Sequence, residues 1–99
     1  MDTFIGKKCI IRTYASGVHF GELVGQDGRE VVLKDARRMW SWWAKSGISL
    51  SEVASVGIIT EKSKICISVP MMKILDAIEI IPASAEAARI IEAAEVYQP

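Results

Sequence analysis

The sequence has no excess of charge of either sign, because 12 lysines and arginines balance 12 aspartates and glutamates. Domains dedicated to nucleic acid usually carry a basic excess, so this balance argues against such a partner. The chain also has no apolar run long enough to cross a bilayer, and its first residues do not resemble a signal peptide. We therefore expect a cytoplasmic protein that has no membrane partner.

Residues that ligate metals or perform catalysis are also scarce. His19 is the only histidine, and the two cysteines, Cys9 and Cys66, stand far apart in apolar segments. Such a set makes no convincing zinc site, and the cysteines are expected to be buried free thiols. The sequence has no glycine-rich phosphate loop and no paired carboxylates near a candidate acid. We therefore expect no metal, no cofactor and no enzymatic activity.

Apolar residues, in contrast, are abundant. They make up 51% of the 99 residues, and the mean hydropathy is +0.26. A single domain of this size has too little interior to hide so much apolar surface. We expect a homo-oligomer, such as a hexameric ring, in which the remaining apolar surface is covered.

Strand-like segments rich in β-branched and aromatic residues dominate the chain, and tight turns such as Asp27-Gly28 separate them. Four extended segments within the first part predict a meander that curls into a barrel. Two more strands follow, with residues 70–73 between them. The predicted strands are Lys8–Tyr14, Val18–Val24, Arg29–Lys34, Arg37–Trp43, Ile65–Val69 and Ala77–Ile81.

Two helices are predicted from their caps. Ser49 and Glu52 form the pattern of a capping box and Gly57 suits the C-cap, which together predict a short helix over residues 50–56. Ser84 caps a second helix with an apolar stripe that begins at Ala87. The expected fold is one domain over residues 1–99, mainly β (α+β). It is a small, strongly bent barrel of five to six strands, with one short inserted helix and a C-terminal helix.

The first part of the chain contains the segments Gly6–Lys8, Gly17–Leu23, Asp27 and Val32–Ala36. Together they resemble the first motif of the Sm-like small barrels. The resemblance implies a barrel of the SH3/Sm-like type that assembles into a ring through its edge strands. Members that bind RNA usually carry an asparagine before the leucine of the third strand, whereas this chain has Gly28–Val31 there. The leading helix of the family is missing as well, so the resemblance favours barrel and ring over RNA binding.

A second resemblance extends over nearly the whole chain, in the segments Arg12–His19, Ala36–Trp42, Leu50–Ser51 and Ile78–Pro82. It is to a small family of phage and prophage proteins to which no activity is attached. The resemblance implies a role in the host cell cytoplasm, in host takeover or counter-defence. Small phage proteins that sequester cyclic-nucleotide or ADP-ribose immune signals are compact oligomers without catalytic residues.

The segment Asp35–Lys45 is the most informative part of the sequence for function. It holds all three tryptophans of the chain beside two adjacent arginines, Arg37 and Arg38. Aromatic planes next to guanidinium groups suit a flat, anionic ligand that stacks, such as a nucleotide. In the alternative interpretation, the tryptophans belong to the core or to an oligomer interface, where Trp and Arg are also enriched.

Alternation along a strand divides this segment between two faces. Met39 marks one face as the core, which leaves the other as the candidate ligand site. The predicted site face holds Arg38, Trp40 and Trp42, and the predicted core face holds Arg37, Met39, Ser41 and Trp43.

The turn between the first two strands offers a second candidate set. Tyr14, Ser16 and His19 place a phenol, a hydroxyl and an imidazole around Gly17, and turn amides can bind an anion. The simpler interpretation is a turn with one partly buried histidine. Ser16 and His19 do not predict a nucleophile and base, because the sequence shows no carboxylate that would orient the histidine.

The function that these observations favour is non-catalytic binding. We expect sequestration of a nucleotide-derived immune signal in the aromatic and arginine pocket, as part of phage counter-defence. One alternative is an Sm-like ring that binds nucleic acid, against which the zero net charge and the missing asparagine count. The other is a structural, protein-binding oligomer in which the tryptophans are interface anchors.

Overall fold

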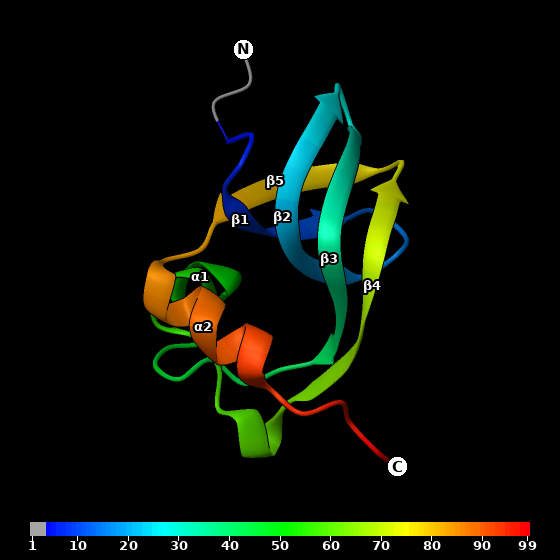
Figure 1. Cartoon of the computed structure of the whole chain (residues 1–99). Helices are drawn as coiled ribbons and strands as arrows, with labels where there is room; N and C mark the ends of the chain where they lie inside the picture. The colour runs from blue at the N-terminus through cyan, green and yellow to red at the C-terminus, as the bar shows by residue number, and fades with distance from the viewer. Residues whose placement is uncertain (1–3) are drawn as a thin grey trace.

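A computed structural model describes residues 4–99 of the chain. Five strands form one antiparallel sheet in the order β4-β3-β2-β1-β5, and two α-helices lie at one side of it (Figure 1). The mainly β class, the short inserted helix and the C-terminal helix are as the sequence predicts. The elements are β1 (Lys8–Thr13), β2 (Val18–Asp27), β3 (Glu30–Ser41), α1 (Leu50–Val56), the 3-10 helix η1 (Thr60–Lys62), β4 (Lys64–Ile74), β5 (Ala77–Pro82) and α2 (Ala85–Ala93).

The sheet is strongly curved and open. In Figure 1, β2 and β3 stand side by side while β1 and β5 pass behind them. Within residues 4–99, β4 and β5 do not pair with each other, so each is an edge and the expected barrel is not closed. Val96 and Tyr97 form no strand, although the Tyr97 amide donates to the Ile65 carbonyl oxygen at 3.0 Å.

One long strand, β3, replaces the two strands predicted over residues 29–43. Asp35 has a φ of 53°, a conformation that is uncommon for a residue other than glycine. The register with β2 shifts here, so that Asp35 and Ala36 of β3 face the single residue Gly21 of β2. The prediction of a turn was wrong because the local irregularity is a β-bulge, which bends a strand without ending it.

A second predicted break is also absent. β4 runs from Lys64 to Ile74 through Pro70, although residues 70–73 were expected to separate two strands. β4 pairs on one side with β3 and has no strand partner on the other. Proline is tolerated on such an edge, since the missing N–H is not needed on the unpaired side.

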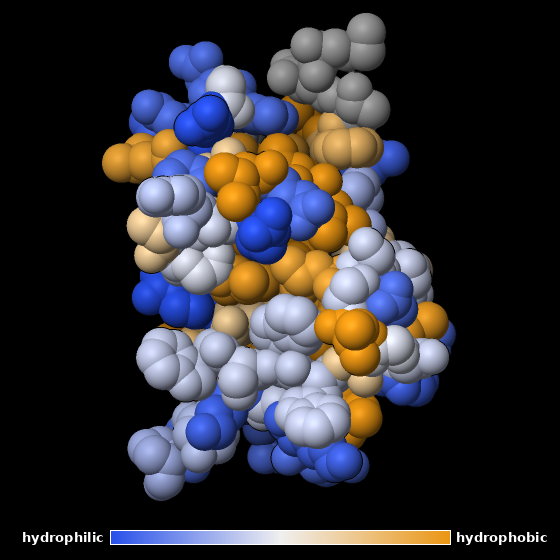
Figure 2. Space-filling view, turned by 180° about the vertical axis from the view of Figure 1, so that it is seen from behind, coloured by the Kyte–Doolittle hydropathy of each residue, from blue (hydrophilic) through white to orange (hydrophobic). Residues whose placement is uncertain are grey.

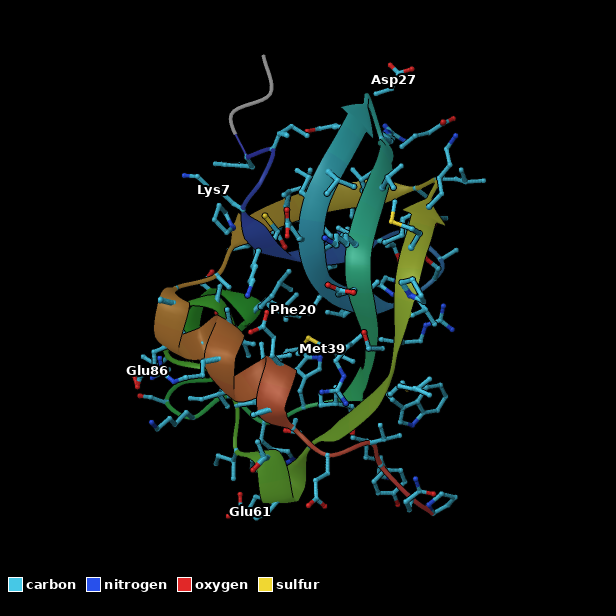
Figure 3. The ribbon with its side chains drawn as sticks, viewed as in Figure 1. Lys7, Phe20, Asp27, Met39, Glu61 and Glu86 are labelled. Atoms are coloured by element: carbon cyan, nitrogen blue, oxygen red, sulfur yellow. The ribbon has the colours of Figure 1, made fainter. Side chains whose placement is uncertain are left out.

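The sheet buries apolar side chains on both faces. Adjacent residues of a strand point to opposite faces, and Ile10 belongs to one cluster while Ile11 belongs to the other. The first cluster joins Phe20 and Met39 of the sheet to both helices (Figure 3). The second is enclosed by the strands themselves and includes Cys9. Both cysteines are free, Cys9 buried and Cys66 half-buried.

The helix boundaries agree with the predicted caps. Ser49 and Glu52 form the capping box of α1, and Gly57 is its C-cap with a φ of 93°. The Ser84 hydroxyl accepts from the Ala87 amide at 3.0 Å and begins α2. Ile48, which precedes the first cap, is 90% exposed and does not pack against α1 as a hydrophobic staple would. Neither helix is long and apolar enough to cross a membrane.

Candidate ligand-binding groove

The turn between β1 and β2 is held against the connection between β4 and β5. The Tyr14 amide donates to the Asp76 carbonyl oxygen at 3.0 Å, and the Ala15 amide donates to Asp76 Oδ2 at 2.7 Å. The Ser16 hydroxyl lies 3.4 Å from Asp76 Oδ1. These contacts fix the turn although its residues are about sixty positions away from Asp76.

A shallow groove of about 420 Å³ opens between this turn and the strands β3 and β4. It brings together three of the residues that the sequence singled out, from two separate segments. Five apolar or charged residues at the end of β4 and just after it form the opposite wall. The lining residues are Ser16, His19, Arg38, Met72, Lys73, Ile74, Leu75 and Asp76.

His19 lies fully buried beside the groove, and Arg38 is its partner across β2 and β3. The His19 Nε2 atom lies 2.9 Å from the Ser16 carbonyl oxygen, so this nitrogen carries the proton and donates. Nδ1 is then an acceptor, and it is buried with no hydrogen-bond partner among residues 4–99. Burial lowers the pKa of His19 below its usual value, and the nearby Arg38 charge lowers this pKa further.

Arg38 is the unpaired charge of the groove. It is exposed and forms no ion pair with any residue from Phe4 to Pro99. Lys73, in contrast, lies 3.3 Å from Glu30, and the Asp76 carboxylate accepts hydrogen bonds from the turn. The cation that remains free to bind an anion in this groove is therefore Arg38.

Ser16, His19 and Asp76 do not form a catalytic relay. Asp76 contacts Ser16 and the backbone of the turn, while His19 Nδ1 has no carboxylate partner. The Ser16 hydroxyl lies 3.1 Å from Thr13 Oγ1 and 3.5 Å from His19 Nε2, which already donates to a carbonyl oxygen. A histidine in this arrangement is not placed to take the hydroxyl proton, so the geometry suits binding better than nucleophilic attack.

Two exposed aromatic residues adjoin the groove residues along the chain, although neither is among the residues that line the groove. Trp40 is 72% exposed and follows Arg38 on the same face of β3. The pairing of β2 with β3 ends where Val18, the first residue of β2, lies opposite Met39. Trp40 therefore lies one position beyond this pair, on the side of the turn. Tyr14, at the start of this turn, is 85% exposed. Both rings are accessible to a ligand that stacks.

The other tryptophans lie elsewhere, because β3 ends at Ser41 and the alternation of faces ends with it. Trp42, expected beside Arg38 and Trp40, is half-buried and packs against the cluster that contains Phe20. Trp43, expected in the core, is exposed, and the Lys62 ammonium lies 5.0 Å from its ring centroid. The three-residue stripe predicted for the site is thus reduced to Arg38 and Trp40.

Arg37 does not reach the groove. It is buried on the helix side of the sheet, on the same face of β3 as Met39, as alternation predicts. Its Nη1 donates to the carbonyl oxygens of Ile91 at 2.9 Å and Ala94 at 2.6 Å, and its Nε donates to the Cys66 carbonyl oxygen at 2.9 Å. Its guanidinium therefore satisfies the carbonyl groups at the end of α2 and is not available to a ligand in the groove.

Sequence reasoning missed the residues that β4 and its connection to β5 contribute to the groove. Lys73, Leu75 and Asp76 fall where no motif was found, and the sequence carries no local signal that places them beside the β1–β2 turn. The curl of the sheet creates this proximity, by bringing the end of β4 around to β1 (Figure 1).

A larger hollow of the described chain, of about 890 Å³, lies elsewhere. It is lined by residues 60–64 and by residues between 90 and 98, and it contains no residue of the predicted site. Its lining carries both acidic and basic side chains. Within residues 4–99, no group of three or more His, Cys, Asp or Glu side chains could hold a metal ion. The smaller groove is the better candidate, because it combines an unpaired cation with a buried unpaired acceptor.

Comparison with known proteins assigns the chain to a family. Residues 6–91 match the family described as a domain of unknown function, DUF6948, so the chain belongs to this family. No curated protein and no solved structure matches the chain.

Proposed function

We propose that this member of the DUF6948 family binds a small planar anion of the nucleotide-derived class in the groove, without altering it. The observation that carries the proposal is the unpaired Arg38, which lies beside buried His19. Trp40, two positions after Arg38 on β3, and Tyr14, in the turn before His19, are exposed aromatic residues. A guanidinium binds phosphate oxygens in a bidentate way, and exposed rings stack on a base.

Binding without turnover supports sequestration. A protein that holds its ligand in a groove without a catalytic relay lowers the free concentration of that ligand. Together with the resemblance to phage proteins, this favours removal of a cyclic-nucleotide or ADP-ribose immune signal in the host cytoplasm. The groove offers one unpaired arginine rather than a basic stripe, so it supports a small ligand better than a long nucleic acid.

Titration calorimetry of the protein with cyclic dinucleotides, cyclic ADP-ribose isomers, AMP and short RNA tests the proposal. Arg38→Gln should weaken binding about tenfold or more, since a hydrogen bond to a charged group contributes about 1.5–3 kcal/mol. Arg89→Gln is the matched control, because Arg89 is an exposed arginine on α2 outside the groove. Equal affinity in both variants, or no binding by the wild type, would overturn the proposal.

Self-association is a second candidate, supported by the two free edges of the sheet. Ile67 and Met71 of β4 and Ile78 of β5 are exposed apolar side chains on these edge strands. Figure 2, which shows the molecule from behind, has apolar side chains gathered on the side where β1 and β5 lie in Figure 1. Free edges with apolar side chains are templates for pairing with another chain. A homo-oligomer such as the hexameric ring of the Sm-like resemblance would cover them.

Light scattering at micromolar concentration tests this second candidate. A monomer of 10.9 kDa would contradict it. If an oligomer forms, Met71→Lys should dissociate it, because the substitution places a charge on the edge of the sheet. Ile48→Lys should not, because Ile48 is equally apolar and 90% exposed but lies outside the sheet.

A further inference from the structure

One buried, unpaired polar atom belongs to a residue that lines the groove, and it bears on the chemistry of the ligand. His19 lines the groove, is fully buried, and leaves Nδ1 without a hydrogen-bond partner among residues 4–99. The proton of the neutral ring is on Nε2, which donates to the Ser16 carbonyl oxygen at 2.9 Å. Nδ1 can therefore only accept a hydrogen bond.

An unpaired acceptor in a buried position is unfavourable, and such groups usually have a partner. The hydroxyl of Ser16 is not that partner, because it lies near Thr13, Asp76 and the other ring nitrogen. Arg38, the cross-strand neighbour, is exposed and unpaired, so its side chain is free to turn toward an anion in the groove.

We infer that the ligand of this groove carries a hydroxyl or amino donor for His19 Nδ1 beside the anionic group that Arg38 binds. The ligand class is thus a phosphate ester with its own N–H or O–H groups, as in a nucleotide with sugar hydroxyls and a base amine. A planar anion without a donor would use Arg38 and the aromatic rings but would leave Nδ1 unpaired. The inference rests on the proposed function and adds the donor requirement to it.

Two probes separate the donor requirement from binding as such. AMP carries a phosphate, a stacking base and several donors, whereas phenyl phosphate carries a phosphate and a ring but, as the dianion, no donor. The single histidine of the chain makes its ring nitrogens unambiguous in ¹⁵N NMR. With AMP, the Nδ1 resonance should move upfield, as for a nitrogen that begins to accept a hydrogen bond; with phenyl phosphate it should stay.

The matched variant is His19→Gln. Its amide group can still donate to the Ser16 carbonyl oxygen in place of Nε2, so the turn keeps its contact, but it presents no acceptor at the position of Nδ1. We expect AMP binding to weaken about three- to tenfold, the range for one neutral hydrogen bond, and phenyl phosphate binding to stay unchanged. Thermal unfolding of the variant checks that it folds, and the NMR shift in the wild type tests the inference without any substitution.

The outcomes distinguish the two proposals. If Arg38→Gln weakens both probes while His19→Gln weakens neither and Nδ1 does not move with AMP, the donor requirement is wrong and the proposed function stands. If Arg38→Gln weakens neither probe, or neither probe binds to the wild type, the proposed function fails and the donor requirement fails with it. Loss of AMP affinity in His19→Gln, together with the Nδ1 shift, supports both.

Discussion

The guanidinium of Arg37 lies 2.6 Å from the carbonyl oxygen of Ala94, one position beyond the last residue of α2. The same side chain also binds the carbonyl oxygen of Ile91 and, on β4, that of Cys66. A single arginine of β3 thus joins the C-terminal end of the helix to the edge of the sheet. Its neighbour in sequence, Arg38, points to the other face and lines the groove.

Arg37→Met should destabilise the protein by about 2–4 kcal/mol, because it leaves several buried carbonyl groups without charged donors. Arg37→Lys should recover part of this loss, since an ammonium group can reach fewer of the carbonyls at once. Arg38→Met is the control and should change stability by less than about 0.5 kcal/mol. Urea unfolding of the three variants measures the differences, and equal losses for Arg37→Met and Arg38→Met would contradict the helix-capping role.

Gly21→Ala should cost about 1–3 kcal/mol, as expected for overpacking at a closely packed position. An added Cβ would lie 3.1 Å from Leu33 Cβ and from the Lys34 carbonyl oxygen, both on the bulged strand. At Gly25, which lies on β2 like Gly21, an added Cβ would be 3.6 Å from the nearest atom of Val32, which is an ordinary contact. Gly25→Ala should therefore leave the melting temperature unchanged or raise it slightly. If both alanines have the same effect, the bulge does not restrict position 21.

Ser49→Ala should cost about 1 kcal/mol, because it removes the capping oxygen at the start of α1. Glu52→Ala should cost less, although its carboxylate accepts from the amides of Ile48 and Ser49 at 3.1 and 2.9 Å. Ser51→Ala tests the specificity of the effect, since this exposed serine is inside the helix, where alanine is the better helix former. Thermal melts in which Ser49→Ala and Ser51→Ala coincide would argue against the cap.

The free energy of unfolding should fall as the pH decreases through the range below about 6.5, the usual pKa of histidine. His19 has a lowered pKa in the folded protein, mainly through burial, so the unfolded chain takes up the proton first. The stabilisation is complete above the unfolded pKa and is lost as the pH falls through the folded pKa. Urea unfolding at pH 7.5, 6.0 and 5.0 measures it for the wild type and His19→Gln, which lacks this component. The same slope in both proteins would mean that other groups cause the pH dependence.

The elements that depend on neighbouring residues could be predicted from the sequence. Both helices begin at serines whose capping partners lie within three positions, and α1 has the predicted bounds. β1 and β5 agree with the predicted strands to within one residue at each end. The sequence wrongly predicted that a strand ends near Asp35 and near Pro70, because aspartate and proline are typical of turns. In this sheet a β-bulge and an unpaired edge accommodate them.

Local sequence patterns predict where the two helices start and that Arg38 and Met39 face opposite ways. Which of the two adjacent arginines serves stability depends on tertiary contacts, because the partners of Arg37 lie on α2 and β4, distant in the sequence. Tertiary structure also places Asp76 and Ser16 in one groove, since only the curl of the sheet brings the end of β4 to the first turn. Contacts between neighbours follow from local propensity and hydrogen bonding, whereas contacts across the chain depend on how the whole sheet bends and packs.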